Sequence, residues 1–425
     1  MHDLDDKEMK VDAAAVHEFR RLEGDLALFT QELVRTPSLP GDEGKVADLV
    51  LEQLRGDGVD ECWLDEMGNV IGVLRGQGTG PNVLLNGHMD VVPPGRLENW
   101  KHAPFAAEID STGTLHGRGS ADMKGGLASL VFALRGMKTL RDRGLELTGN
   151  IIFAAVVHEE SAGMLGMQHL CMTTLPARQL GFDVCYLAEP TNGQINLGHR
   201  GKVEIVVQTT GRTAHSSSPW KGVNAIEKMV PVLEAVFGGL GKDMPSDPEL
   251  GSSTITVTNL VCEPGALSII PDSCEISVDR RYLPGESVEE ILAGFGAVFD
   301  RLRARDPDFA ASASVRTTLE RSYTGLEREV QKRRPAWIVS RDNTFVRETR
   351  SALKDIGHKA EVGHFMGGVD GALTAGVLGI PTIGYSGADE SLAHTEEEHT
   401  TVETLVSDME AYIAILTRLL EAGAS

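Results

Sequence analysis

The strongest constraint on the fold is a run of seven apolar residues, 151–157, that ends in His158, Glu159 and Glu160. A strand this uniformly apolar is typical of a parallel sheet that helices cover on both faces. Two adjacent carboxylates at the end of a buried strand are costly to desolvate unless something compensates their charge. The run therefore predicts a core strand with functional groups at its end.

Similar apolar runs recur along the chain and alternate with helical patterns. Strands are predicted within 69–76, 81–92, 183–190 and 376–387, and amphipathic helices within 16–36, 43–58, 125–137, 343–357 and 401–423. Apolar strands that alternate with helices indicate an α/β fold with a mostly parallel sheet and helices on both faces.

Between about residues 198 and 320 the pattern changes. Four segments in this region alternate apolar and polar residues, as half-exposed antiparallel strands do, and two helical patterns lie among them. We therefore predict a larger α/β domain formed by residues 1–197 and 321–425, and a small inserted α+β domain with an antiparallel sheet, residues 198–320.

Charge and composition exclude several classes of partner. The 425 residues include 40 Lys and Arg against 62 Asp and Glu, a formal net charge of −22, which argues against nucleic acid or an anionic membrane as partner. No stretch approaches the roughly 18–20 apolar residues of a membrane helix, and residues 1–10 are acidic rather than signal-like. The five cysteines are scattered, which is typical of a reduced cytoplasm, so we expect a cytoplasmic protein.

Five metal-binding side chains are predicted where strands end or where a glycine-rich turn opens a helix. They are His88, Asp122, Glu160, Glu189 and His394. The carboxyl ends of parallel strands line the ligand crevice of such sheets. Two histidines and three carboxylates suit two zinc ions, or cobalt or manganese, with one carboxylate bridging them. Asp122 would bridge, His88 and Glu189 would complete one site, and Glu160 and His394 the other.

Two further acids are predicted to serve this centre without binding metal. Asp90, two residues past His88, would hydrogen-bond the second nitrogen of that histidine and fix its tautomer. Glu159 stands beside the site and would act as general base. Taken alone, the His88–Asp90 pair could be an ordinary hydrogen bond, and Glu159–Glu160 a solvated surface pair. Together, the residues favour a metal centre.

Seven blocks in order resemble one metallopeptidase family, the M20 family, which includes acetylornithine deacetylase, succinyl-diaminopimelate desuccinylase, aminoacylase and glutamate carboxypeptidase. The blocks are NGHMDVVPPG, GRGSADMKGGLAS, HEESAG, LAEPT, GRTAHSSSPWKGVNAI, DRRYLPGE and AHTEEE. The resemblance implies a two-zinc catalytic domain, an inserted lid, cleavage of amide bonds and a cis bond between Asp122 and Met123. It implies the same five ligands, with Glu159 as base and Asp90 orienting His88.

The resemblance assigns two lid residues. His215 corresponds to a histidine that, in dimeric members, reaches the partner subunit's site and stabilises the oxyanion. Arg281 corresponds to an arginine that binds the substrate carboxylate, although the adjacent Arg280 leaves the register open. The alternatives are a helix-capping histidine and a lid salt bridge. Two departures, Ser268 for the usual asparagine and Ala372 for the usual arginine, leave the recognition of an α-carboxylate undecided.

The function that these residues predict is metal-dependent hydrolysis of an amide in a small N-acyl amino acid or dipeptide-like substrate, and the resemblance implies a homodimer joined through the lid. An N-carbamoyl amino acid amidohydrolase is the alternative on the same fold. A non-catalytic binding protein is disfavoured because all five ligands and Glu159 are present together.

Overall fold

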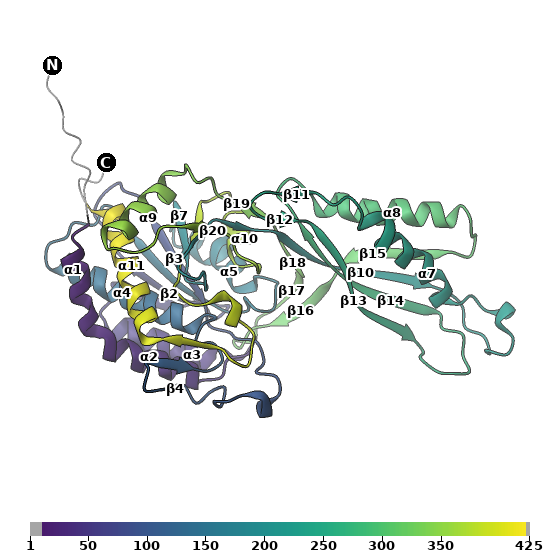
Figure 1. The fold of residues 1–425 in the computed structure, drawn as a ribbon, viewed down its shortest axis with the longest axis horizontal. Coiled ribbons are helices and arrows are strands. Elements are labelled where there is room, and N and C mark those ends of the chain that lie inside the picture. The colour runs from purple at the N-terminus through teal and green to yellow at the C-terminus, as the bar shows by residue number, and fades with distance from the viewer. Residues whose placement is uncertain (1–10, 422–425) are drawn as a thin grey trace, which may run out of the picture.

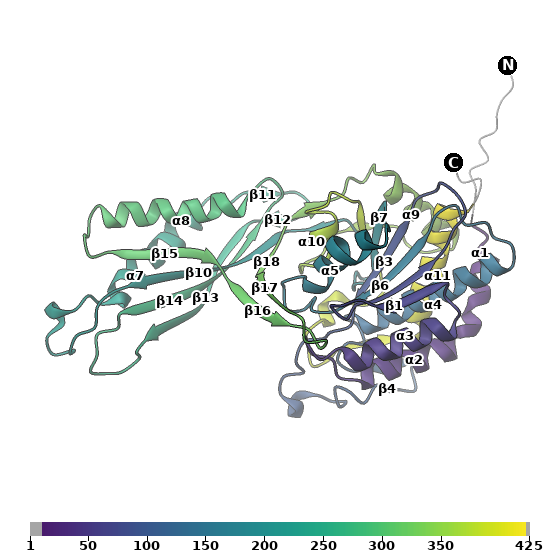
Figure 2. The same cartoon turned by 180° about the vertical axis from the view of Figure 1, so that it is seen from behind.

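The computed structural model describes residues 11–421, so the acidic segment 1–10 considered above lies outside the described residues. Two sheets organise the chain, and each has its own hydrophobic core. Figures 1 and 2 show that the smaller sheet extends away from the larger body of the molecule. Both termini of the described chain lie on the body, at the end opposite the smaller sheet.

The larger sheet, called the body sheet, has eight strands. In spatial order they are β1 (Glu61–Leu64), β2 (Val70–Leu74), β6 (Ile151–Val156), β3 (Val83–His88), β7 (Val184–Leu187), β21 (Thr382–Gly384), β8 (Ile195–Asn196) and β20 (Val362–Gly363). Strands β6, β3, β7 and β21 run parallel, whereas β1 and β2 form an antiparallel edge. The α/β class is confirmed, with a sheet that is parallel at its centre and mixed towards its edges.

Helices pack around the body sheet. They are α1 (Ala13–His17), α2 (Glu23–Arg35), α3 (Gly44–Gly56), α4 (Lys124–Asp142), α5 (Leu165–His169), α6 (Leu175–Ala177), α9 (Thr344–Asp355), α10 (Gly371–Thr374) and α11 (Val402–Leu420). The single helix expected within 16–36 is interrupted by a 3₁₀ segment, Glu18–Leu22. None of the helices in 11–421 combines the length and the hydropathy needed to cross a membrane.

Helix α4 lies unusually close to the strand ends that carry the predicted site. A Cβ placed on Gly126 would come within 2.1 Å of the Ala188 carbonyl oxygen, and one on Gly87 within 2.8 Å of the Met123 side chain. At Gly126 only glycine permits this approach, because a side chain would meet the backbone of Ala188, whereas at Gly87 the contact is with the flexible end of a side chain. Gly126 thus allows the start of α4, two residues after Asp122, to lie against the chain that follows β7.

The second sheet, called the lid sheet, is antiparallel. Its strands are β13 (Thr254–Glu263), β14 (Ser273–Tyr282), β10 (Gly201–Thr210) and β15 (Ala310–Val315), with β18 (Arg333–Arg334) also paired to β10. Alternate residues Val203, Ile205 and Val207 of β10 pack on helices α7 (Ala225–Glu234) and α8 (Val288–Arg303). The antiparallel lid is confirmed. The boundaries at residues 198 and 320 stay a proposal, and β18 lies beyond the second of them.

Shorter strands complete the fold. They are β4 (Glu108–Ile109), β5 (Thr114–His116) and β22 (His399–Thr401) in one sheet, and the pairs β9 (Gly198–His199) with β19 (Trp337–Ile338), β11 (Ser246–Asp247) with β12 (Gly251–Ser252), and β16 (Thr317–Arg321) with β17 (Glu327–Gln331). The β9–β19 pair lies where the chain passes between the body sheet and the lid sheet.

Candidate metal centre

The five predicted ligands meet at the carboxyl ends of the parallel strands. His88 ends β3, Glu160 follows β6, Glu189 follows β7, and His394 lies in the segment after β21. Asp122 lies two residues before the start of α4, and its peptide bond to Met123 is cis, as the resemblance implies. Strand ends from distant parts of the sequence therefore converge because the body sheet is parallel at its centre.

Asp122 is shared between two groups of possible ligand atoms. Its Oδ1 lies 3.2 Å from His88 Nε2, and that nitrogen lies 3.7 Å from Glu189 Oε1. Its Oδ2 lies 3.3 Å from His394 Nε2, which lies 3.1 Å from Glu160 Oε2. Within each group, ligand atoms lie within 4.8 Å of one another. One carboxylate thus presents one oxygen to each of two adjacent positions.

The chemistry of these residues fits two divalent cations. Each group offers one imidazole nitrogen and two carboxylate oxygens, a donor set that suits zinc, cobalt or manganese. Glu160 Oε1 is buried and has no hydrogen-bond partner within the described residues. Burial, reinforced by the charge of Asp122, raises the pKa of Glu160 to about 7, and burial raises the pKa of Glu189 well above its usual range. Cations at these positions would offset the clustered negative charge.

Glu159 lies beside the two groups but belongs to neither. Its side chain is 5% exposed, and its Oε1 lies 2.8 Å from Arg334 Nη2. Arg334 also donates to the Glu159 backbone carbonyl. Burial raises the pKa of Glu159, and the positive charge of Arg334 opposes that shift. Arg334 therefore holds this carboxylate at the edge of the centre, a contact that the sequence did not predict.

Asp90 fixes both His88 and the Glu159–Glu160 pair. His88 Nδ1 donates to the Asp90 backbone carbonyl over 2.8 Å, whereas the Asp90 carboxylate is 3.7 Å from that nitrogen. The carboxylate instead accepts the backbone N–H groups of Glu159, at 3.1 Å, and Glu160, at 2.9 Å. The predicted histidine contact is therefore made by the main chain of Asp90, while its side chain orients the two glutamates.

An acid missed by the sequence analysis, Glu398, anchors the loop that carries Asp122. Its Oε1 accepts the backbone N–H groups of Gly119, Ala121 and Asp122 at 2.8–3.1 Å, and its Oε2 pairs with the buried Arg118. Burial raises the pKa of Glu398 to about 7, and Arg118 opposes the shift. The run of three glutamates at 396–398 looks like a polar surface in sequence, but Glu398 is 1% exposed.

A cavity of about 600 Å³ opens beside the two groups. Its wall includes Asp122, Glu159, Glu160, Glu189 and His394 from the body, and Lys202, Arg281 and Arg334 from the lid sheet. This volume suits a small-molecule substrate.

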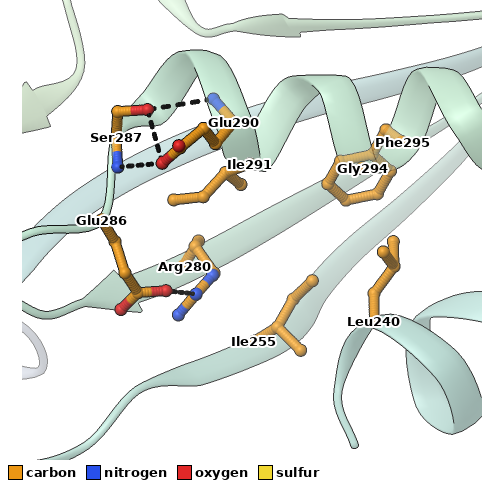
Figure 3. Close-up of a pocket in the computed structure, with 9 residues that line it drawn as sticks. All are labelled: Leu240, Ile255, Arg280, Glu286, Ser287, Glu290, Ile291, Gly294 and Phe295. Atoms are coloured by element: carbon orange, nitrogen blue, oxygen red, sulfur yellow. Dashed lines mark hydrogen bonds and ion pairs between the residues drawn. The ribbon is translucent and has the colours of Figure 1, made fainter. Parts of the chain in front are cut away.

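The structure separates the two adjacent arginines of the lid. Arg281 lines the cavity, and its Nε donates to Asp279 over 2.8 Å. Arg280 points to the other face of the sheet, where it pairs with Glu286 beneath α8 (Figure 3). Of the two, only Arg281 can reach a substrate in the cavity.

His215 is not brought to the centre of its own chain. It is exposed, it follows the end of β10 distant from Lys202, and it accepts hydrogen bonds from the N–H, at 3.1 Å, and hydroxyl, at 2.7 Å, of Ser217. A strand rises about 3.4 Å per residue, so the end of β10 at Thr210 lies about 27 Å along the sheet from Lys202. A role at the centre would therefore require the centre of another chain.

Each of the two groups pairs a histidine with carboxylates, and the groups share one aspartate. They lie at the strand ends of an α/β sheet and beside a cavity. This arrangement defines the class of metal-dependent hydrolases. A model of peptidase family M20/M25/M40 matches residues 84–422, so the chain belongs to this family. The resemblance drawn from the sequence is confirmed. The protein is a metal-dependent hydrolase that acts on amide bonds.

The chain is also similar to relatives over most of its length. The chain is 32% identical over 399 residues to the protein YgeY of Escherichia coli K12, covering 92% of this chain and 94% of YgeY. It is 28% identical over 399 residues to succinyl-diaminopimelate desuccinylase of Methylococcus capsulatus, covering 92% and 96%.

Among solved structures, aminopeptidase PepT of Bacillus cereus superposes with a TM-score of 0.70 at 23% identity, covering 93% of this chain and 98% of that one. YxeP of Bacillus subtilis, described as a dinuclear metal binding peptidase from the M20 family, gives 0.65 at 17% identity, covering 93% and 98%. At these identities the likeness shows the shared fold.

Proposed function

We propose that the protein is a di-zinc amidohydrolase that cleaves an amide bond in a small N-acyl amino acid or dipeptide-like substrate. The observation that carries this proposal is the shared Asp122, with Glu159 placed beside both groups and outside them. His88, Asp122 and Glu189 would hold one ion, and Asp122, Glu160 and His394 the other. When bound, these ions supply Lewis-acid chemistry that polarises an amide carbonyl and makes water more acidic.

In this proposal the side chains of the chain itself bind the substrate and move the proton. Glu159 accepts a proton from the attacking water on its carboxylate and returns it to the leaving amine. Arg334 keeps that carboxylate directed at the cavity through the 2.8 Å contact. Arg281, on the lid side, binds a carboxylate of the substrate.

Turnover of a substrate panel tests the proposal. Zinc- or cobalt-loaded protein would be assayed against N-acetyl, N-succinyl and N-carbamoyl amino acids and dipeptides, with metal content measured in the same samples. We expect two ions per chain and release of an amine with a carboxylic acid. Release of an amine with ammonia would favour the carbamoyl alternative, and folded protein without bound metal would contradict the proposal.

We further propose a homodimer in which His215 of one protomer serves the centre of its partner. The His215→Ala variant should then lower turnover by about 10²–10³-fold, the range expected for loss of an oxyanion donor, with unchanged metal content. Steady-state kinetics and metal analysis check this result. Unchanged turnover would exclude His215 from the reaction.

Mixing two impaired variants tests whether the residue acts between subunits. Glu159→Gln protein keeps His215, and His215→Ala protein keeps Glu159, so a heterodimer would contain one complete centre. We expect turnover to reappear after the two variants exchange subunits. Failure to recover activity, when sedimentation shows that heterodimers have formed, would contradict the arrangement.

A further inference from the structure

Three cationic side chains form one row across neighbouring strands of the lid sheet. Lys202 of β10 lies directly opposite Arg281 of β14 on one side and opposite Arg334 of β18 on the other. All three side chains line the cavity of the metal centre. Like charges directly opposite one another destabilise a sheet, so this row needs anionic partners.

Two members of the row already have a partner at short distance. Arg334 contacts Glu159 at 2.8 Å, and Arg281 donates to both oxygens of Asp279, at 2.8 and 3.4 Å, through Nε and Nη2. The Nη1 group of Arg281 takes no part in that pair, so Arg281 retains donors for another anion.

Lys202 lacks a comparably close partner. Its nearest carboxylate oxygens belong to Glu204, at 3.5 Å, and Asp279, at 3.9 Å. Both acids lie one row further from the body, and Asp279 is already engaged by Arg281. The Lys202 side chain is 25% exposed and faces the cavity. Its ammonium group is therefore only loosely compensated within the described chain.

The opposite wall of the cavity would not supply the missing charge. It carries five carboxylates, of which Glu159 is already paired with Arg334, and Glu390 accepts the backbone N–H groups of Met366 and Gly367 at 2.8 and 3.4 Å. The other three, those of Asp122, Glu160 and Glu189, belong to the two groups of ligand atoms and would face two divalent ions. With the metals bound, none of these carboxylates is left over for Lys202, so a substrate anion is the partner that this side chain can take.

We infer that Lys202 and Arg281 together bind a carboxylate of the substrate on the lid side of the cavity, and that Lys202 determines specificity for anionic amides. This inference rests on the proposed function, and it adds Lys202 to the single arginine expected from the resemblance. A carboxylate has two oxygens, so one can accept from the Arg281 guanidinium while the other accepts from the Lys202 ammonium. Substrates without a carboxylate at this end lose both contacts.

Binding of simple carboxylates to the zinc-loaded full chain tests the inference without requiring turnover. Succinate has two carboxylates, one that can bind at the metal centre and one that can bind Lys202 and Arg281. Acetate has a single carboxylate. Titration calorimetry of the Lys202→Met variant should show succinate binding weakened by about tenfold and acetate binding unchanged. The Lys202→Arg variant should retain most of the succinate affinity because it keeps the charge.

The matched control is Arg333→Met. Arg333 lies next to Arg334 on β18, is exposed, and stands opposite Val203 rather than Lys202. Its substitution therefore removes one positive charge from the same strand but outside the row. This control should leave both affinities unchanged. If Lys202→Met has no larger effect than Arg333→Met, the inference is wrong, while two bound zinc ions would leave the proposed function standing. Absence of zinc in the folded protein would instead remove the basis of both.

Discussion

The Glu159→Gln variant should keep both metal ions and lose turnover by about 10²–10⁴-fold, the range for a residue that transfers protons. Glutamine has nearly the same shape and can occupy the same place beside Arg334, which lies 2.8 Å from Glu159 Oε1. It cannot take up a proton from water. Because Glu159 is in neither group of ligand atoms, the metal content should not change. Steady-state kinetics with metal analysis of the same samples provide the measurement.

The adjacent Glu160→Gln variant is the matched control. Glu160 belongs to the group formed with Asp122 and His394, so its replacement should lower metal content along with turnover. Parallel losses of metal and turnover in Glu159→Gln as well would mean that the general base has been assigned to the wrong glutamate.

The Asp122→Asn variant should lose affinity for both ions and have no detectable turnover. Asp122 is common to both groups, and its two oxygens face different histidines, at 3.2 and 3.3 Å. An amide has no charge and only one good acceptor, so it cannot bridge: one position loses its ligand from residue 122 and the other keeps only an uncharged one. The affinity for each ion should fall by more than the roughly 10–100-fold that follows from removing a residue that only hydrogen-bonds to a metal ligand. Titration with a competing chelator measures it.

A comparison with Glu189→Gln shows whether Asp122 is shared. Glu189 belongs to one group only, so this variant should weaken one ion and spare the other. An Asp122→Asn protein that still binds two ions as tightly as the unmodified protein would contradict the proposed bridge.

Much of the fold follows from local sequence patterns. The uniformly apolar runs correspond to β3, β6 and β7, which are buried throughout, and the alternating segments correspond to the half-exposed strands of the lid sheet. The antiparallel edge formed by β1 and β2 was not predicted. A short strand has the same composition in either direction, and its direction depends on which neighbour it pairs with.

The candidate ligands could be predicted from the sequence because each follows a strand or opens a helix. The parallel arrangement of the strands then brings such positions together. This reasoning could not have predicted the roles of Lys202, Arg334 and Glu398. Lys202 and Arg334 become neighbours only through the register between β10 and β18. Glu398 is buried only because the segment after His394 folds against the loop of Asp122. Contacts of this kind depend on tertiary structure, on which local periodicity carries no information.

The placement of the cationic row at the near end of a long lid has a mechanical consequence. Lys202 lies at the start of β10, close to where the chain leaves the body, whereas His215 follows the distant end. A rotation of the lid by about 10° about its base would move a group about 27 Å away by roughly 5 Å and would move Lys202 very little. The same rotation of the lid would thus displace its far end much more than its base. Recognition of the substrate anion would be insensitive to its angle, and any chemistry that depends on His215 would be highly sensitive to it.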